Sequence, residues 1–334
     1  MLLRQTIKAA LKRGALVAAA NWPVALVQAT ADALFKLLLA VPLVGGLVLV
    51  TLVVRTGSDP LAATDWRVMV TSLVASLLEH RLVLTAFLLS LAVVLIGGSL
   101  FMFLMKGGAV GVLVRGERQA GAVEVPPLRP EVIATASAFS IELFIASARS
   151  LFPRYARLGF VLMAVYLLSG AAYVAIVRSG IAASWEIATL ATAAFVAWTT
   201  LVNLLYLMMQ VVVAADDCGL RSAARRGLLF LRHDGRTVAG VFVVILALVV
   251  LASGASVLAF AALGLISIIP FMWLAAVPLQ LLAFVLRAVV FQYIALSSLG
   301  AYLTLYRQAA TRVAVMEDPR AWGVAPALPQ ERDT

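Results

Sequence analysis

The sequence predicts an all-α membrane protein with six transmembrane helices. Of its 334 residues, 63% are hydrophobic and 13% are charged, and the mean hydropathy is +1.05, whereas apolar residues make up roughly half of an ordinary soluble domain. Several runs rich in Leu, Ala and Val reach the ~20 residues that a helix needs to cross ~30 Å of hydrocarbon. These runs lack the apolar-polar alternation of membrane β-barrel strands. The fold class is therefore helical.

The N-terminal segment predicts an amphipathic helix rather than a cleaved signal peptide. The uncharged run that follows its basic residues ends at Asn21, too early for the apolar core of a signal. Arg4, Lys8 and Lys12 recur at intervals of four residues and share one side of a helix over 2–19. Such a helix is expected to lie in the headgroup plane of a membrane.

Six apolar segments follow as predicted spans: 37–54, 82–105, 158–178, 187–215, 237–259 and 288–306. Residues 106–130 are rich in Gly and Pro and predict a connection, although Gly107 and Gly111 also have the G-x-x-x-G spacing found in helix dimers. Residues 260–286 contain Pro270 and Pro278, so we expect a shallow or re-entrant excursion there rather than a straight crossing.

The predicted spans form three pairs, each preceded by an amphipathic cytoplasmic helix, at 2–19, 131–150 and 218–232. This layout suggests a three-fold pseudo-repeat of helical hairpins as a hypothesis. Residues 1–312 are expected to form a single polytopic membrane domain, and residues 313–334 a disordered cytoplasmic tail.

The positive charges predict the orientation. With both termini in the cytoplasm, about twenty of the 26 Lys and Arg residues lie on the cytoplasmic side, and four lie on the other side: Arg55, Arg67, Arg81 and Arg178. This bias follows the positive-inside rule. The formal net charge of +10 predicts anionic lipids as partners rather than nucleic acid, because the basic residues lie beside apolar spans.

Asp216 and Asp217 invite comparison with the Asp-rich motif of alcohol phosphotransferases that make phospholipids. Those enzymes need several carboxylates on one helical face to hold divalent metal and a nucleotide diphosphate. Here Cys218 stands between Asp217 and Gly219, and the downstream carboxylates are missing. The two histidines, His80 and His233, are predicted on opposite sides of the membrane. We therefore expect no catalytic residues, no metal site and no cofactor.

The segment after the acidic pair predicts a lipid-headgroup site at Arg221, Arg225, Arg226 and Arg232. On a helical projection Arg221, Arg225 and Arg232 share a face, and Leu220, Ala224, Leu228 and Leu231 are expected on the other. Guanidinium groups match phosphate oxygens well. A helix lying flat on the membrane, with its arginines among the phosphates, is expected.

Polar residues inside the predicted spans form two stripes, which are expected to face the interior of the bundle. They are Asn203, Tyr206 and Gln210 in the fourth span and Arg287, Ser298 and Tyr302 along the last. Such residues form either hydrogen bonds between helices or a polar path.

The acidic pair, the Arg-rich helix over 219–232, and a final helix ending in Tyr302, Tyr306 and Arg307 resemble a broad group of bacterial six-span membrane proteins. The group includes the membrane domain found ahead of some glycerophosphodiester phosphodiesterases and stand-alone proteins of uncharacterised function. The resemblance implies six helices and an inner-membrane location. It does not imply phosphodiesterase activity, because no soluble domain is expected after Arg312.

The sequence thus predicts a noncatalytic protein of the bacterial inner membrane that engages anionic lipids, or a membrane-protein partner, through basic cytoplasmic helices. The first alternative is a small transporter or channel lined by the polar residues of the fourth and sixth spans. The second is an enzyme that acts on lipid headgroups.

Overall fold

The computed structural model describes residues 2–53, 80–267 and 272–317, and these residues fold into helices and the turns between them. The helices are α1 (Leu2–Ala20), α2 (Trp22–Val53), α4 (Arg81–Gln119), α5 (Pro130–Thr135), α6 (Ile141–Ala183), α7 (Trp185–Asp216), α8 (Leu220–Ser267) and α9 (Trp273–Glu317). The described part of the chain contains no strand, and the predicted all-α class is confirmed.

Six of the helices are long and apolar enough to cross a membrane, as predicted: α2, α4, α6, α7, α8 and α9. Their candidate spans run from 25 to 47 residues, whereas ~20 residues cover the hydrocarbon of a bilayer. Most of these helices are therefore longer than one crossing at right angles to the bilayer requires.

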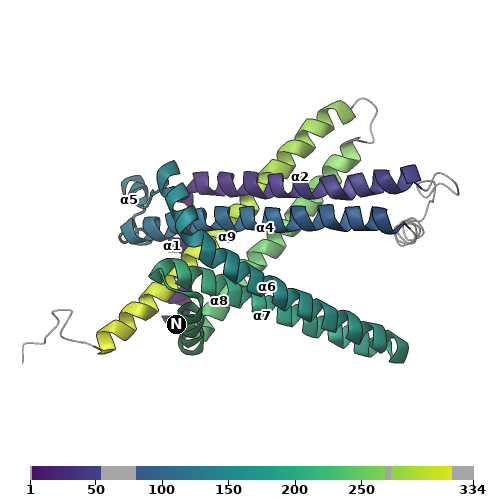
Figure 1. Cartoon of the computed structure of the whole chain (residues 1–334). Helices are drawn as coiled ribbons and strands as arrows, with labels where there is room; N and C mark the ends of the chain where they lie inside the picture. The colour runs from purple at the N-terminus through teal and green to yellow at the C-terminus, as the bar shows by residue number, and fades with distance from the viewer. Residues whose placement is uncertain (1, 54–79, 268–271, 318–334) are drawn as a thin grey trace, which may run out of the picture.

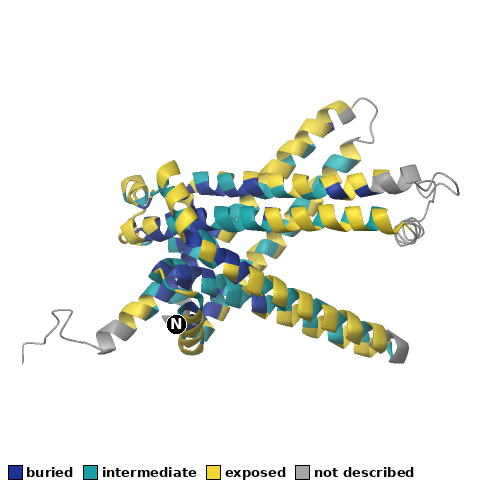
Figure 2. Ribbon diagram, viewed as in Figure 1, coloured by how far each residue is buried: buried dark blue, intermediate teal, exposed yellow. Residues whose placement is uncertain are grey.

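The long helices are arranged as three pairs that share one base. Helix α2 lies beside α4, α6 beside α7, and α8 beside α9 (Figure 1). The pairs converge near α1 and diverge toward the other end of the molecule (Figure 1). Buried residues gather where the pairs converge, and the diverging arms are mostly exposed (Figure 2). The three-fold repeat itself stays a hypothesis.

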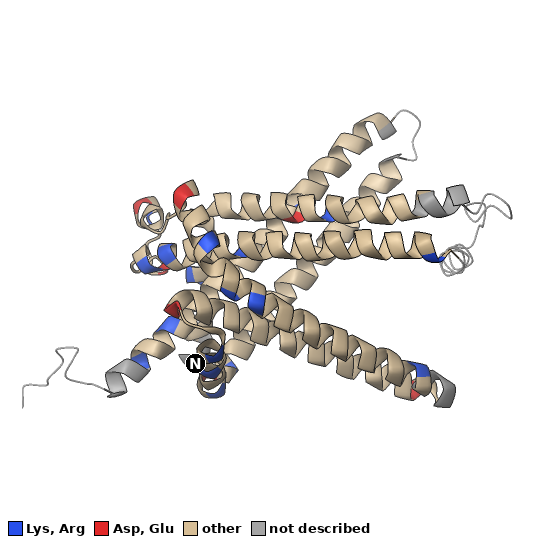
Figure 3. Ribbon diagram, in the orientation of Figure 1, with Lys and Arg blue, Asp and Glu red and all other residues tan. Residues whose placement is uncertain are grey.

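Most Lys and Arg residues also gather where the pairs converge (Figure 3). We call this region the basic end; it comprises α1, residues 106–119 of α4, residues 215–236 of α7 and α8, and residues 300–312 of α9. Arg81 and Arg178 lie far from the basic end, at the first residue of α4 and near the last residue of α6. Arg55 and Arg67 lie outside the described residues.

The Gly-rich segment 106–119 is helical, so the predicted connection shrinks to residues 120–129. The glycines allow α4 to approach α6 closely. A Cβ atom on Gly111 would lie 2.3 Å from the Cβ atom of Ser147, and Gly107 also lies against α6. The G-x-x-x-G spacing therefore serves a contact within the chain. Packing here outweighs the low helix propensity of glycine.

The segment predicted as one surface helix over 131–150 is broken in two. Helix α5 ends at Thr135 and α6 begins at Ile141. The hydroxyl group of Ser140 accepts a hydrogen bond from the backbone N–H of Leu143 at 3.1 Å, which caps the start of α6. From there α6 continues into the third span, so its first turns extend a membrane helix.

The backbone between α5 and α6 is held by one buried side chain, Asn21. Its amide nitrogen donates to the carbonyl oxygens of Val17 at 2.9 Å and Ala136 at 2.8 Å, and its amide oxygen accepts from the N–H of Ala138 at 2.9 Å. Asn21 thereby fixes the junction of α1 and α2 to the break before α6. The sequence analysis identified Asn21 only as the end of the uncharged run after the N-terminal basic residues, and did not predict these hydrogen bonds.

The third predicted surface helix is also part of a longer element. Residues 220–233 continue into the fifth span as α8, with one non-helical residue, Asp234, at φ −111° and ψ 17°. Of the predicted shallow or re-entrant excursion over 260–286, residues 260–267 continue α8 and residues 273–286 begin α9, which includes Pro278. Residues 268–271, with Pro270, lie outside the described residues. Helix α9 extends five residues into the predicted tail; positions 318–334 lie outside the described residues.

Helix α1 packs against α9 through a close crossing at two glycines. A Cβ atom on Gly14 would lie 2.4 Å from the backbone nitrogen of Ala301, and one on Gly300 would lie 2.9 Å from the Cα atom of Gly14. Ala10 and Val17 are buried on the same side of α1. Helix α1 is thus attached to the bundle; its placement in the headgroup plane stays a prediction.

We expect Gly14→Ala to lower the stability of the protein by about 1–3 kcal/mol, the usual cost of overpacking, because the new methyl group meets backbone that cannot move aside. Gly254→Ala is the matched control, since a Cβ atom there meets nothing within 4 Å and alanine is the better helix former. Thermal unfolding in detergent measures both. Equal midpoints for the two variants would contradict the close crossing.

Candidate functional site

The acidic pair at the end of α7 forms ion pairs and a hydrogen bond within the protein. The Asp216 carboxylate accepts from the Arg226 guanidinium and from the Tyr306 hydroxyl, each at 2.5 Å. Asp217 has a left-handed backbone, with φ 49°, and pairs with Arg154. The two carboxylates thereby join α7 to α6, α8 and α9. Among the described residues, no three His, Cys, Asp or Glu side chains lie close enough together to hold a metal ion.

Of the four arginines predicted as a headgroup site, three remain without an ion-pair partner among the described residues: Arg221, Arg225 and Arg232. All three are exposed and share one side of the first part of α8. Arg226 points elsewhere and pairs with Asp216. The structure therefore separates Arg226 from the other three.

The opposite side of this helix packs on the bundle through Ala223, Gly227 and Phe230, which are buried. The ring of Phe230 meets that of Tyr306 edge-on, with centroids 5.6 Å apart. This contact fixes the direction in which the three free arginines project.

The predicted apolar face of the same helix is confirmed only in part. Leu220 and Leu231 are half-buried against the core, whereas Ala224 is exposed and Leu228 is 63% exposed. Leu229, which the prediction did not assign to this face, is 48% exposed. At about 100° per residue, Leu228 lies about 20° from Arg221 and Leu229 about 40° from Arg225 on the helical projection, so the two leucines flank the arginines. We call the exposed set Arg221, Arg225, Leu228, Leu229 and Arg232 the arginine face.

The polar stripe of α7 faces the interior only in part. Gln210 is buried and its amide nitrogen has no hydrogen-bond partner among the described residues. Tyr206 is half-buried, and the Lys106 ammonium group lies 5.6 Å from the centre of its ring. Asn203 is exposed, contrary to the prediction, and accepts a hydrogen bond from the Tyr166 hydroxyl at 2.6 Å.

The polar residues of α9 are divided in the same way. Ser298 and Tyr302 are buried, and the Tyr302 hydroxyl has no hydrogen-bond partner among the described residues. Arg287 is exposed, contrary to the prediction, and its guanidinium lies 5.6 Å from the centre of the Phe291 ring. No described hydrogen bond joins this stripe to that of α7. The six residues therefore do not form one connected polar cluster.

Sequence reasoning missed a buried charge cluster at the basic end. The Glu117 carboxylate pairs with Arg13, at 3.3 Å, and with Arg307. Arg13 also pairs with Glu124 at 2.8 Å. Side chains of α1, α4 and α9 thus meet at one carboxylate that is 7% exposed. The only signal in the sequence was an acidic residue within a basic stretch.

Two hollows border α1. The first, about 770 Å³, lies beside the Glu117 cluster and has Thr6, Thr304 and Arg312 in its wall. The second, about 570 Å³, lies between α1, α8 and α9. The residues that form its wall are Ile7, Lys8, Leu11, Lys12, Ala15, Val244, Ile245, Leu248, Tyr293, Ile294, Ser297 and Ser298.

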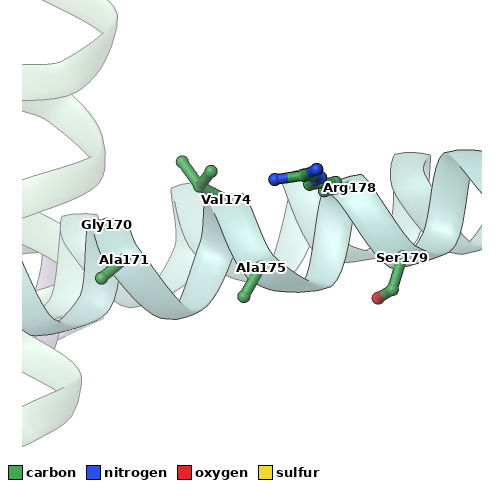
Figure 4. Close-up of a pocket in the computed structure, with 6 residues that line it drawn as sticks. All are labelled: Gly170, Ala171, Val174, Ala175, Arg178 and Ser179. Atoms are coloured by element: carbon green, nitrogen blue, oxygen red, sulfur yellow. The ribbon is translucent and has the colours of Figure 1, made fainter.

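A third hollow, about 810 Å³, lies at the outer end of α6. Figure 4 shows the lining residues along one stretch of the helix, with Val174 and Arg178 toward the upper edge in this view and Ala175 and Ser179 toward the lower edge. All the lining residues belong to this single helix. One helix cannot enclose a ligand, so we assign no site there.

Comparison of the chain with protein-family models, curated proteins and solved structures gave no match. The chemistry of the chain's own side chains is therefore the basis for any functional proposal.

We expect Glu117→Gln to destabilise the protein by about 3–5 kcal/mol, because Arg13 and Arg307 would remain largely buried without their shared counter-charge. Glu142→Gln removes an exposed carboxylate and is the control, with a change within about 0.5 kcal/mol. Chemical unfolding in detergent reports both values. A loss no larger than that of the control would show that the Glu117 cluster does not hold the helices together.

Proposed function

We propose that the protein is a noncatalytic, multi-pass protein of a bacterial inner membrane that binds anionic phospholipids at its basic end. One observation carries the proposal. The arginine face presents three guanidinium groups without ion-pair partners among the described residues, next to two exposed leucines.

This combination suits the boundary between lipid headgroups and hydrocarbon. Arginine donates paired hydrogen bonds to phosphate oxygens, and exposed leucines beside it gain free energy by entering the acyl region. Arg221 and Arg232 lie three turns apart along the helix, on either side of Leu228. The buried contact of Phe230 with Tyr306 holds the arginine face in position before any lipid binds.

We place the basic end and both termini in the cytoplasm. Supporting this orientation, most Lys and Arg residues lie at that end (Figure 3), and cytoplasmic segments of membrane proteins carry an excess of Lys and Arg. The cytoplasmic leaflet also carries the negative surface potential that attracts basic segments.

The two alternatives have less support. A transport path would need connected polar groups across the bundle, but Asn203 and Arg287 are exposed on different helices. An enzyme that acts on headgroups would need an available carboxylate, but Asp216 and Asp217 are each paired with an arginine.

We expect Arg225→Gln to reduce the enrichment of anionic over zwitterionic phospholipid about five-fold, since each cationic side chain near a membrane contributes ~1 kcal/mol. The triple variant R221Q/R225Q/R232Q is expected to reduce it further. The measurement is mass spectrometry of lipids that copurify in a mild detergent, relative to the lipid ratios of the source membrane.

Arg226→Gln is the matched control for this experiment, because it removes the same charge from the neighbouring position but lies outside the arginine face. Its lipid ratios should equal those of the wild type. If the triple variant and the wild type carried the same lipids, or if Arg226→Gln had the larger effect, the proposal would be rejected.

A further inference from the structure

The hollow between α1, α8 and α9 has two chemically distinct ends. We call it the α1 groove. Lys8 and Lys12 contribute the charged groups of its wall, whereas Leu11, Ile245 and Leu248 are among its apolar residues. Its volume of about 570 Å³ lies within the roughly 300–1,000 Å³ of ordinary ligand pockets.

The contacts between α1 and α9 show how the groove is oriented. The Tyr293 hydroxyl donates to the carbonyl oxygen of Ala15 at 3.0 Å, whereas Thr6 shares the other hollow with Thr304 and Thr311. Residues early in α1 therefore lie beside residues late in α9, and the two helices run in opposite directions where they pack together. Helix α1 belongs to the basic end, so Lys8 and Lys12 lie on the side of the groove that this end forms.

Helix α8 shows the same direction. A Cβ atom on Gly240 would lie 2.4 Å from the side chain of Ile7. The part of α8 that follows Asp234 therefore contacts α1 near the N-terminal end of α1. Leu248 follows two turns later, toward the diverging arms. The groove thus has its cationic groups toward the basic end and an apolar wall that continues toward the arms.

The lysines are available to an anion. Lys8 is exposed and has no ion-pair partner among the described residues. Lys12 donates one hydrogen bond, at 2.8 Å, to the backbone carbonyl oxygen of Glu124. An ammonium group has three N–H donors, so Lys12 is positioned by this bond and retains donors for a ligand.

We propose that the α1 groove holds one anionic phospholipid of the surrounding membrane, with its phosphate at Lys8 and Lys12 and an acyl chain along Ile245 and Leu248. The direction of the charge along the groove matches that of a lipid in the leaflet next to the basic end. An acyl chain gains little by moving from bilayer to an apolar wall, because both are apolar. The shape of the groove therefore retains the chain, and the lysines select the negative headgroup. This site is separate from the arginine face.

Native mass spectrometry of the full chain in detergent tests the proposal, with phosphatidylglycerol and phosphatidylcholine as the added probes. We expect the wild type to retain one phosphatidylglycerol per chain after washing. Leu248→Trp fills the groove and should reduce this occupancy at least ten-fold. Leu246→Trp is the matched control, because Leu246 is 46% exposed and is not part of the groove wall. Lys8→Gln should keep a lipid but lower the preference for phosphatidylglycerol about five-fold.

Several outcomes would overturn the site: no retained lipid in the wild type, equal occupancy in the two tryptophan variants, or an unchanged lipid preference in Lys8→Gln. The triple variant R221Q/R225Q/R232Q separates the two proposals. It should keep the tightly held lipid of the α1 groove even though it loses general enrichment of anionic lipid. Loss of the held lipid in this variant, with Leu248→Trp unaffected, would move the site to the arginine face.

Discussion

The carboxylate of Glu117 is buried between two guanidinium groups that come from opposite ends of the chain, Arg13 and Arg307. A buried charge costs several kcal/mol unless opposite charges and hydrogen bonds surround it. The cluster therefore requires α1, the end of α4 and the end of α9 to meet at one place. Away from the basic end the six long helices are mostly exposed (Figure 2), so the convergence at the basic end sets how the three pairs are arranged. Both proposed lipid sites lie on helices positioned by this convergence.

The sequence was sufficient to predict the class of the fold and the separation of the third and fourth spans, 158–178 and 187–215, because the apolar runs and their flanking charges are direct consequences of the bilayer. It was not sufficient to predict how far each helix continues. Gly107 and Gly111 disfavour a helix in water, yet they are helical here because α6 lies against them. The break before α6 likewise depends on Asn21, which is more than a hundred residues away in the chain. Such contacts leave no periodic pattern in a single sequence.

The same distinction applies to the candidate sites. The three arginines of the arginine face could be identified from their helical spacing, but the buried side of that helix could not, since Ala223 and Gly227 are small residues that give no clear hydrophobic pattern. Asp216 and Asp217 suggested chemistry because acidic pairs often bind metal, whereas the structure pairs them with Arg226 and Arg154. The α1 groove involves three helices whose lining residues are separated by more than two hundred positions, and only the fold brings them together.

The divergence of the three helix pairs has a consequence for the membrane itself. The three pairs spread from a common base (Figure 1), and the gaps between them widen with distance from that base. In a bilayer, lipid tails fill the space between spreading apolar arms, so lipid contacts the inner as well as the outer sides of the pairs. The packing of those lipid tails then contributes to the free energy of the folded state.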